Sequence, residues 1–215
     1  MKFARLLTLT AATLIFVASA AWAQDDLDGL TTRKPARRQT AAEEENNDPA
    51  RPGPVLGVGA LYALDNFSNV GMDTNGSGGF NARVGYRHNR WVAYEVEIGK
   101  YVQFNGDVSA FGPGGQGEVN GWAVGGNVRG YLLPGRVQPF LIGGINYLKM
   151  ETTNSLNKAN PNKTDDGPGL RLGAGVDVYA TPKIVVTSDV SYMLGLGDVK
   201  DYDMVLFSLG FAYRP

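Results

Sequence analysis

The fold is decided by one stretch of sequence, Leu170-Arg171-Leu172-Gly173-Ala174-Gly175-Val176-Asp177-Val178. Leucine, alanine and valine occupy its even positions, whereas arginine, glycine and aspartate occupy the odd ones. Successive side chains of a β-strand point to opposite faces, so this alternation predicts a strand with one apolar and one polar face. The alternation recurs in residues 80–86, 92–98 and 204–213, and no window after Pro54 has a helical period. This part of the chain is therefore predicted to be all-β.

The predicted strands and the lengths of their connections define the topology. We expect eight strands, at residues 55–64, 79–87, 91–104, 119–132, 137–150, 169–180, 184–194 and 203–213. Tight turns at 87–90, 133–136 and 180–183 alternate with longer polar stretches at 65–78, 105–118, 151–168 and 195–201. This regular alternation is typical of an antiparallel up-and-down transmembrane β-barrel with long external loops and short periplasmic turns. An even strand count then places both termini in the periplasm.

The two faces of these strands allow two interpretations. In a soluble lipocalin-like carrier the apolar face points inward, around a ligand. In a membrane barrel the apolar face meets lipid and the polar face lines the lumen. The polar face is rich in glycine and alanine, which favours a narrow interior over a solvated exterior. The side chains predicted to form a charge network in the lumen are Arg83, Glu95, Glu97, Asn127, Arg129, Arg171, Asp177 and Asp189.

Aromatic residues gather near the ends of the predicted strands. One group, near the short turns, consists of Tyr86, Trp91, Phe140, Phe211 and Tyr213, and the other, near the long loops, of Tyr62, Phe80, Trp122, Tyr147 and Tyr192. Two such belts are expected where strands cross both membrane interfaces. Strict alternation points Tyr131 and Tyr179 inward instead, so either a bulge shifts the register there or they fill the periplasmic mouth.

The amino-terminal residues indicate export. Lys2 and Arg5 precede an apolar run that ends in Ala21-Trp22-Ala23, so residues 1–23 are predicted to be a cleaved signal peptide. The alternative, an uncleaved anchor, requires a longer apolar stretch. Residues 24–53 are charged and poor in large apolar side chains, which predicts a disordered periplasmic linker. Its basic and acidic clusters could instead contact peptidoglycan or lipid headgroups.

Composition and motifs limit the chemistry that we expect. Cleavage after Ala23 leaves 18 basic and 21 acidic residues, which argues against nucleic-acid binding. The only histidine, His88, lies in a predicted short turn, away from the outer leaflet where a lipid-modifying enzyme would need it. Asp198, Asp201 and Asp203 match no established calcium loop. We therefore predict a protein that is not an enzyme and has no cofactor and no metal site.

Several stretches resemble a known family: Tyr94–Gly99, Val137–Gly144, Gly173–Val178 and Phe207–Tyr213. They are similar to those of the small outer-membrane β-barrels of Gram-negative bacteria, which include the OmpA transmembrane domain, OmpX, OmpW and the porin-like opacity-type proteins. The resemblance covers residues 54–215 and implies a monomeric barrel in the cell outer membrane, in contact with lipid and lipopolysaccharide. It also implies insertion by the outer-membrane assembly machinery, which reads a terminal aromatic residue. Here Arg214 and Pro215 follow Tyr213.

The predicted role is structural or surface-interacting, because eight strands enclose an interior just wide enough for side chains. Paired charges in such an interior fill it. A narrow porin-like channel for small solutes is the alternative within the membrane. A soluble periplasmic lipocalin-like carrier is the alternative outside it.

Overall fold

A computed structural model of the chain describes residues 48–65, 72–74, 76–108, 116–154 and 163–215. The predicted signal peptide and residues 24–47 of the predicted linker lie outside these ranges. No helix in the described part of the chain combines the length and the hydropathy that a membrane crossing requires.

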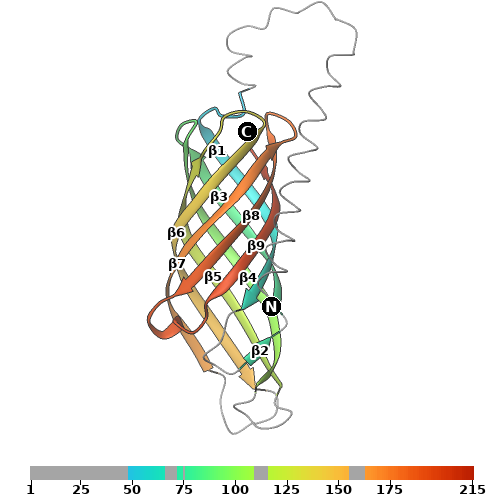
Figure 1. The fold of residues 1–215 in the computed structure, drawn as a ribbon, viewed down its shortest axis with the longest axis vertical. Helices are drawn as coiled ribbons and strands as arrows, with labels where there is room; N and C mark the ends of the chain where they lie inside the picture. Colours follow the sequence, from blue (N-terminus) through green and yellow to red (C-terminus); the bar gives the residue numbers. More distant parts are fainter. Residues whose placement is uncertain (1–47, 66–71, 75, 109–115, 155–162) are drawn as a thin grey trace, which may run out of the picture. The chain divides into compact units, whose positions relative to one another are not determined.

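The described residues form one antiparallel sheet that closes on itself. Its strands are β1 (Gly53–Asp65), β2 (Met72–Thr74), β3 (Ser77–Arg87), β4 (Val92–Val108), β5 (Gln116–Tyr131), β6 (Val137–Asn154), β7 (Lys163–Tyr179), β8 (Ile184–Gly195) and β9 (Met204–Tyr213). All except β2 pair in the order β4-β3-β1-β9-β8-β7-β6-β5, and a β4–β5 pairing closes the ring (Figure 1). The predicted eight-stranded up-and-down barrel is confirmed.

Four strands extend further than the sequence pattern predicts. Residues 105–108 and 116–118, expected in a loop, continue the β4–β5 ladder with Gly106 opposite Gly117. Likewise, β6 reaches Asn154 and β7 begins at Lys163, inside the expected loop 151–168. The short β2 pairs with the far end of β4. Backbone pairing needs no apolar face, so a ladder can continue after the side-chain alternation has ended.

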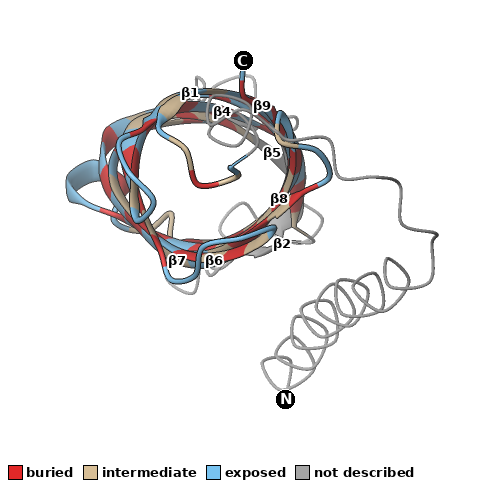
Figure 2. Cartoon of the chain, turned by 90° about the horizontal axis from the view of Figure 1, so that it is seen from above, coloured by how far each residue is buried: buried red, intermediate tan, exposed pale blue. Residues whose placement is uncertain are grey.

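The apolar side chains point outward around the barrel wall. Leu172, Ile145 and Val58 are 69%, 68% and 63% exposed, whereas their neighbours along each strand face the interior. Buried and exposed residues alternate around the ring (Figure 2). Val176 follows the outward parity of β7 but is only 7% exposed between its partners Pro139 and Ser188. This arrangement is the reverse of that in a lipocalin-like carrier, in which the apolar face surrounds a ligand.

The aromatic residues follow the predicted belts with one exception. Tyr86, Trp91, Phe211 and Tyr213 are exposed near the short turns, and Tyr62, Phe80, Tyr147 and Tyr192 near the long loops. Phe140, expected in the first belt, is buried inside the barrel, because even positions of β6 face inward. Tyr131 and Tyr179 are also buried, and the ladders beside them run without a register shift. Of the two explanations above, filling of the mouth is therefore correct.

The outward apolar face generates a prediction of stability in lipid. Leu209 lies near the middle of β9 and is 60% exposed, so Leu209→Arg would place a cation in the acyl chains. We expect this to lower the free energy of unfolding by about 2–4 kcal/mol. The same change at Leu133, which is 56% exposed in a short turn, should be nearly neutral. Urea unfolding of the barrel in lipid vesicles measures both, and equal small losses would contradict lipid contact at Leu209.

Candidate functional site

The lumen is filled by three layers of inward side chains. A mouth layer at the short-turn end contains Arg87, Tyr131, Gln138, Phe140, Tyr179 and Arg214. A charge layer in the middle contains the eight side chains predicted above, all buried. An apolar plug at the long-loop end consists of Leu61, Ala63, Tyr101, Ala123, Leu148, Met150, Met193, Val199, Met204 and Leu206. In the described chain, the sheet therefore encloses packed side chains rather than an open bore.

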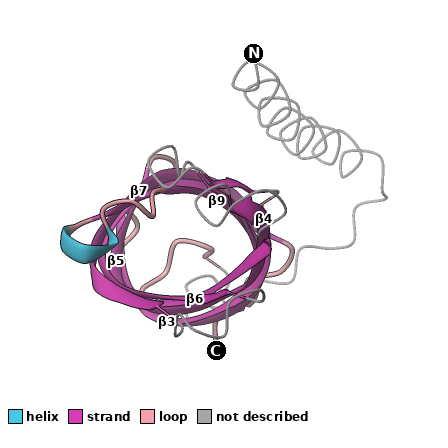
Figure 3. Ribbon diagram, turned by 90° about the horizontal axis from the view of Figure 1, so that it is seen from below, coloured by secondary structure: helices cyan, strands magenta, loops and turns pink. Residues whose placement is uncertain are grey.

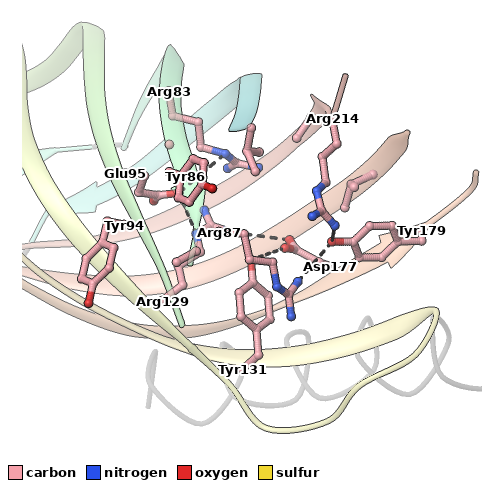
Figure 4. Close-up of a pocket in the computed structure, with 15 residues that line it drawn as sticks. Arg83, Tyr86, Arg87, Tyr94, Glu95, Arg129, Tyr131, Asp177, Tyr179 and Arg214 are labelled. Atoms are coloured by element: carbon pink, nitrogen blue, oxygen red, sulfur yellow. Dashed lines mark hydrogen bonds and ion pairs between the residues drawn. The ribbon is translucent and has the colours of Figure 1, made fainter. Parts of the chain in front are cut away.

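One half of the charge layer is organised around Arg129 of β5. Its Nε lies 2.8 Å from Glu95 Oε2, and its Nη1 lies 3.4 Å from both Asp177 Oδ1 and Thr187 Oγ1. The Tyr131 hydroxyl donates to Asp177 Oδ2 at 3.0 Å, and the Arg129 guanidinium lies 4.3 Å from the centre of the Phe140 ring. These contacts join β4, β5, β6, β7 and β8 across the lumen. Figure 4 shows those among Glu95, Arg129, Tyr131 and Asp177.

The other half of the charge layer is organised around Arg171 of β7. Its Nη1 donates to Glu97 Oε1 at 2.8 Å, its Nη2 to Asp189 Oδ1 at 2.9 Å, and its Nε to Ser191 Oγ at 2.9 Å. Glu97 comes from β4, which is separated from β7 by β5 and β6. The Arg171 side chain therefore spans the lumen and pairs with one oxygen of each of two carboxylates.

Glycines on the inner face make room for these long side chains. The Arg83 guanidinium lies across Gly57, its partner on β1, so that a Cβ there would be 2.8 Å from Arg83 Nε. A Cβ at Gly144 would collide with Asn127 Oδ1 of the neighbouring strand. The glycine content of the polar face, which the sequence analysis linked to a narrow interior, is thus explained by side chains that lie flat against the wall.

A short segment ahead of β1 enters the mouth of the barrel. We call Asp48–Pro52 the mouth strap. Arg214 donates from Nη1 to the Pro49 carbonyl and from Nη2 to the Arg51 carbonyl, while Arg51 Nη2 donates to the main-chain oxygen of Pro215 at 2.7 Å. Ala50 is buried, and the segment lies within the ring of strands in both axial views (Figures 2 and 3). Residues 48–52, at the end of the predicted linker, therefore contact the end of the barrel.

Comparison with known proteins identifies the family. The family described as outer membrane protein beta-barrel domain matches residues 9–214. The chain belongs to this family. No curated protein matches it.

This outer-membrane barrel is similar in fold to solved barrels of low sequence identity. OprG of Pseudomonas aeruginosa is 14% identical with a TM-score of 0.57, over 79% of this chain and 98% of that one. The amino-terminal barrel domain of OprF from the same organism is 14% identical with a TM-score of 0.54, over 77% and 100%. Ail, the attachment invasion locus protein of Yersinia pestis, is 16% identical with a TM-score of 0.54, over 76% and 99%. These likenesses concern the fold alone.

The eight predicted lumen residues do not all take part in the pairing. Seven are charged and fall into the groups around Arg129 and Arg171, although Arg83 reaches Glu95 only at 3.9 Å. The amide atoms of Asn127 have no hydrogen-bond partner in the described part of the barrel. The plug was not predicted, and of the mouth layer only Tyr131 and Tyr179 were considered from the sequence. One signal for the plug was available in the sequence: in residues 204–213 the inward positions include the apolar residues Met204 and Leu206.

Two other residues considered in the sequence analysis lie outside the lumen. His88 is exposed in the turn after β3, with its ring 6.4 Å from that of Tyr94. Asp203 accepts hydrogen bonds from the Tyr192 hydroxyl and the Gly195 amide. No group of three or more acidic or histidine side chains in the described ranges is arranged to hold a metal ion.

The cross-lumen pairing of Arg171 generates a second prediction. Arg171→Met leaves Glu97 and Asp189 buried without a cation, and we expect it to cost about 3–5 kcal/mol of unfolding free energy. Adding Glu97→Gln and Asp189→Asn should restore most of the loss, since the uncompensated charges are then gone. As a control, Lys149→Met breaks the exposed Lys149–Glu151 pair, 3.0 Å apart, and should cost at most about 1 kcal/mol. Equal losses in the single and triple variants would contradict this account.

Proposed function

We propose that this outer-membrane barrel has a structural or surface-interaction role and does not conduct solutes. The observation that carries the proposal is the filling of the lumen, in the described part of the chain, by the buried side chains of the mouth layer, the charge layer and the apolar plug. Buried ion pairs that span the lumen resist displacement, because separating them leaves unpaired charges in a poorly solvated interior. An apolar constriction adds a second barrier, since ions lose hydration there. We assign the barrel no catalytic role.

The orientation that we propose follows from the connections. The short turns and the ends of β1 and β9 that adjoin the mouth strap would face the periplasm, and the long hairpins β4–β5 and β6–β7 the outside of the cell. Both chain termini would then be periplasmic. The outward apolar face would contact lipid and, in the outer leaflet, lipopolysaccharide. Tyr213 at the end of β9 would serve the assembly machinery in place of a terminal aromatic residue, and the inserted barrel would be a monomer.

The charge of the long-loop end limits the partners of such a surface. In residues 65–78, 105–118, 151–168 and 195–203 there are ten acidic residues and three lysines. One structure of Ail contains sucrose octasulfate, a heparin analogue. The acidic excess in this chain would repel a polyanion of that kind, and therefore favours a neutral or cationic partner.

A barrel that does not conduct should carry no ionic current across a planar bilayer. The purified barrel, shown to be folded by its heat-modifiable migration, should give no discrete current steps, because the described side chains of the three layers fill the lumen. A general porin inserted under the same conditions provides the positive control. Reproducible single-channel steps from the heat-modifiable species would overturn the proposal in favour of the narrow channel.

The proposed orientation can be tested by cysteine labelling, because the natural chain has no cysteine. Asp198→Cys at the long-loop end should react with a membrane-impermeant maleimide on intact cells. Arg136→Cys, exposed in a short turn, should react only after the outer membrane is permeabilised. Labelling of the two positions in the opposite order would show that the barrel is inserted the other way round.

A further inference from the structure

A small cavity of about 20 Å³ lies at the short-turn end of the lumen, between the mouth layer and the charge layer. The charged residues that line it are Arg83, Arg87, Glu95, Arg129, Asp177 and Arg214 (Figure 4). Four guanidinium groups thus face two carboxylates. All six side chains are buried, so bulk water screens this imbalance poorly.

The two carboxylates of the cavity are already engaged by one arginine. Glu95 Oε2 lies 2.8 Å from Arg129 Nε, and Asp177 receives Arg129 and the Tyr131 hydroxyl on its two oxygens. Arg83 is left at 3.9 Å from Glu95, and its Nε has no hydrogen-bond acceptor. Glu97, directly opposite Arg83 in the β3–β4 ladder, is paired with Arg171, so the Arg83 guanidinium has no ion pair closer than 3.9 Å among the described residues.

Arg87 and Arg214 are bound by neutral groups. Arg87 donates to Gln138 Oε1 at 2.5 Å, to the Tyr179 hydroxyl at 3.2 Å and to the carbonyls of Asn89 and Arg90. Its guanidinium also lies 3.8 Å from the centre of the Tyr131 ring. Neither Arg87 nor Arg214 forms an ion pair with a carboxylate in the part of the chain that the structure describes.

Arg214 has a donor that remains free. Its Nη1 and Nη2 donate to carbonyls of the mouth strap, and Nη1 also to the Tyr179 hydroxyl at 2.8 Å, but its Nε has no acceptor. Asp48, the acidic residue of the strap, is exposed and accepts the amide of Ala50 at 2.8 Å. A buried cation that is bound by neutral oxygens alone is costly, and a counter-ion close to the free Nε donor would lower this cost.

We propose that this cavity binds one halide-sized monovalent anion, chloride under cellular conditions, between the guanidinium groups of Arg83, Arg87 and Arg214. The volume suffices for about one water-sized particle, so it excludes phosphate and sulfate. The anion enters from the short-turn end, past the mouth strap. Among the described residues, the buried lumen holds five arginines and four carboxylates, so one monovalent anion balances the charge. The site needs no passage through the charge layer or the plug, so it is independent of whether the barrel conducts.

The experiment uses the full chain, folded in detergent micelles. The temperature of thermal unfolding is compared in sodium chloride and in sodium gluconate of equal ionic strength. Separately, crystals are grown in sodium bromide, and the anomalous scattering of bromide locates the bound halide. Chloride should raise the unfolding temperature in a saturable way, as expected for a ligand that binds only the folded state. Bromide should give a peak beside the Arg83, Arg87 and Arg214 side chains. Equal unfolding temperatures in the two salts, together with no bromide peak, would overturn the proposal.

Three variants separate a specific site from a general effect of salt. Arg83→Gln removes one guanidinium and should weaken halide binding about tenfold or more, as expected for a lost charge-assisted hydrogen bond. Glu95→Gln adds to the positive excess and should strengthen it. Arg136→Gln, an exposed arginine in a short turn, is the matched control and should bind as the natural chain does. A chloride effect of equal size in Arg83→Gln and Arg136→Gln would contradict the site. If Arg83→Gln does not fold, the test rests on Glu95→Gln, and weaker or unchanged halide binding by that variant would contradict the site.

Discussion

The structure depends on one constraint: in lipid, every backbone amide and carbonyl has to find its partner within the protein. An open sheet cannot meet this requirement at its edges, and the β4–β5 ladder removes them. Closure with eight strands fixes a narrow interior, which has room for side chains and little else. The composition of the inner face then follows, because each long side chain needs a small residue opposite, as Arg83 has in Gly57.

The same narrowness determines how charges can be tolerated inside. A buried arginine is acceptable when it reaches carboxylates from several strands, and Arg171 does this across the lumen with Glu97 and Asp189. Such contacts link strands that are not neighbours in the sheet, so they oppose flattening of the barrel as well as neutralising charge. Toward the long loops the interior changes character, and methionine and leucine fill it without any pairing requirement.

The sequence was most informative where one strand face differs clearly from the other. The alternation in residues 170–178 predicted β7, and the charged positions in it predicted which side chains lie in the lumen. It was least informative near the strand ends. Phe140 has the chemistry of a belt residue, and only the register of β6 shows that it points inward. Arg87 lies at a short turn and Arg214 follows the last strand, and at such positions an arginine is expected to be solvated. The sequence could not predict their burial, because the residues that contact them are distant in the chain.

The mouth strap has a consequence for the order of folding. The carbonyls of Pro49 and Arg51 are bound by Arg214, which follows the last strand, so the strap cannot dock until β9 is in place. The barrel seam between β1 and β9 must form at the same stage, because those strands carry the two segments to one spot. Docking of Asp48–Pro52 therefore reports that the barrel has closed, because the binding site for this segment exists only after β1 and β9 have paired.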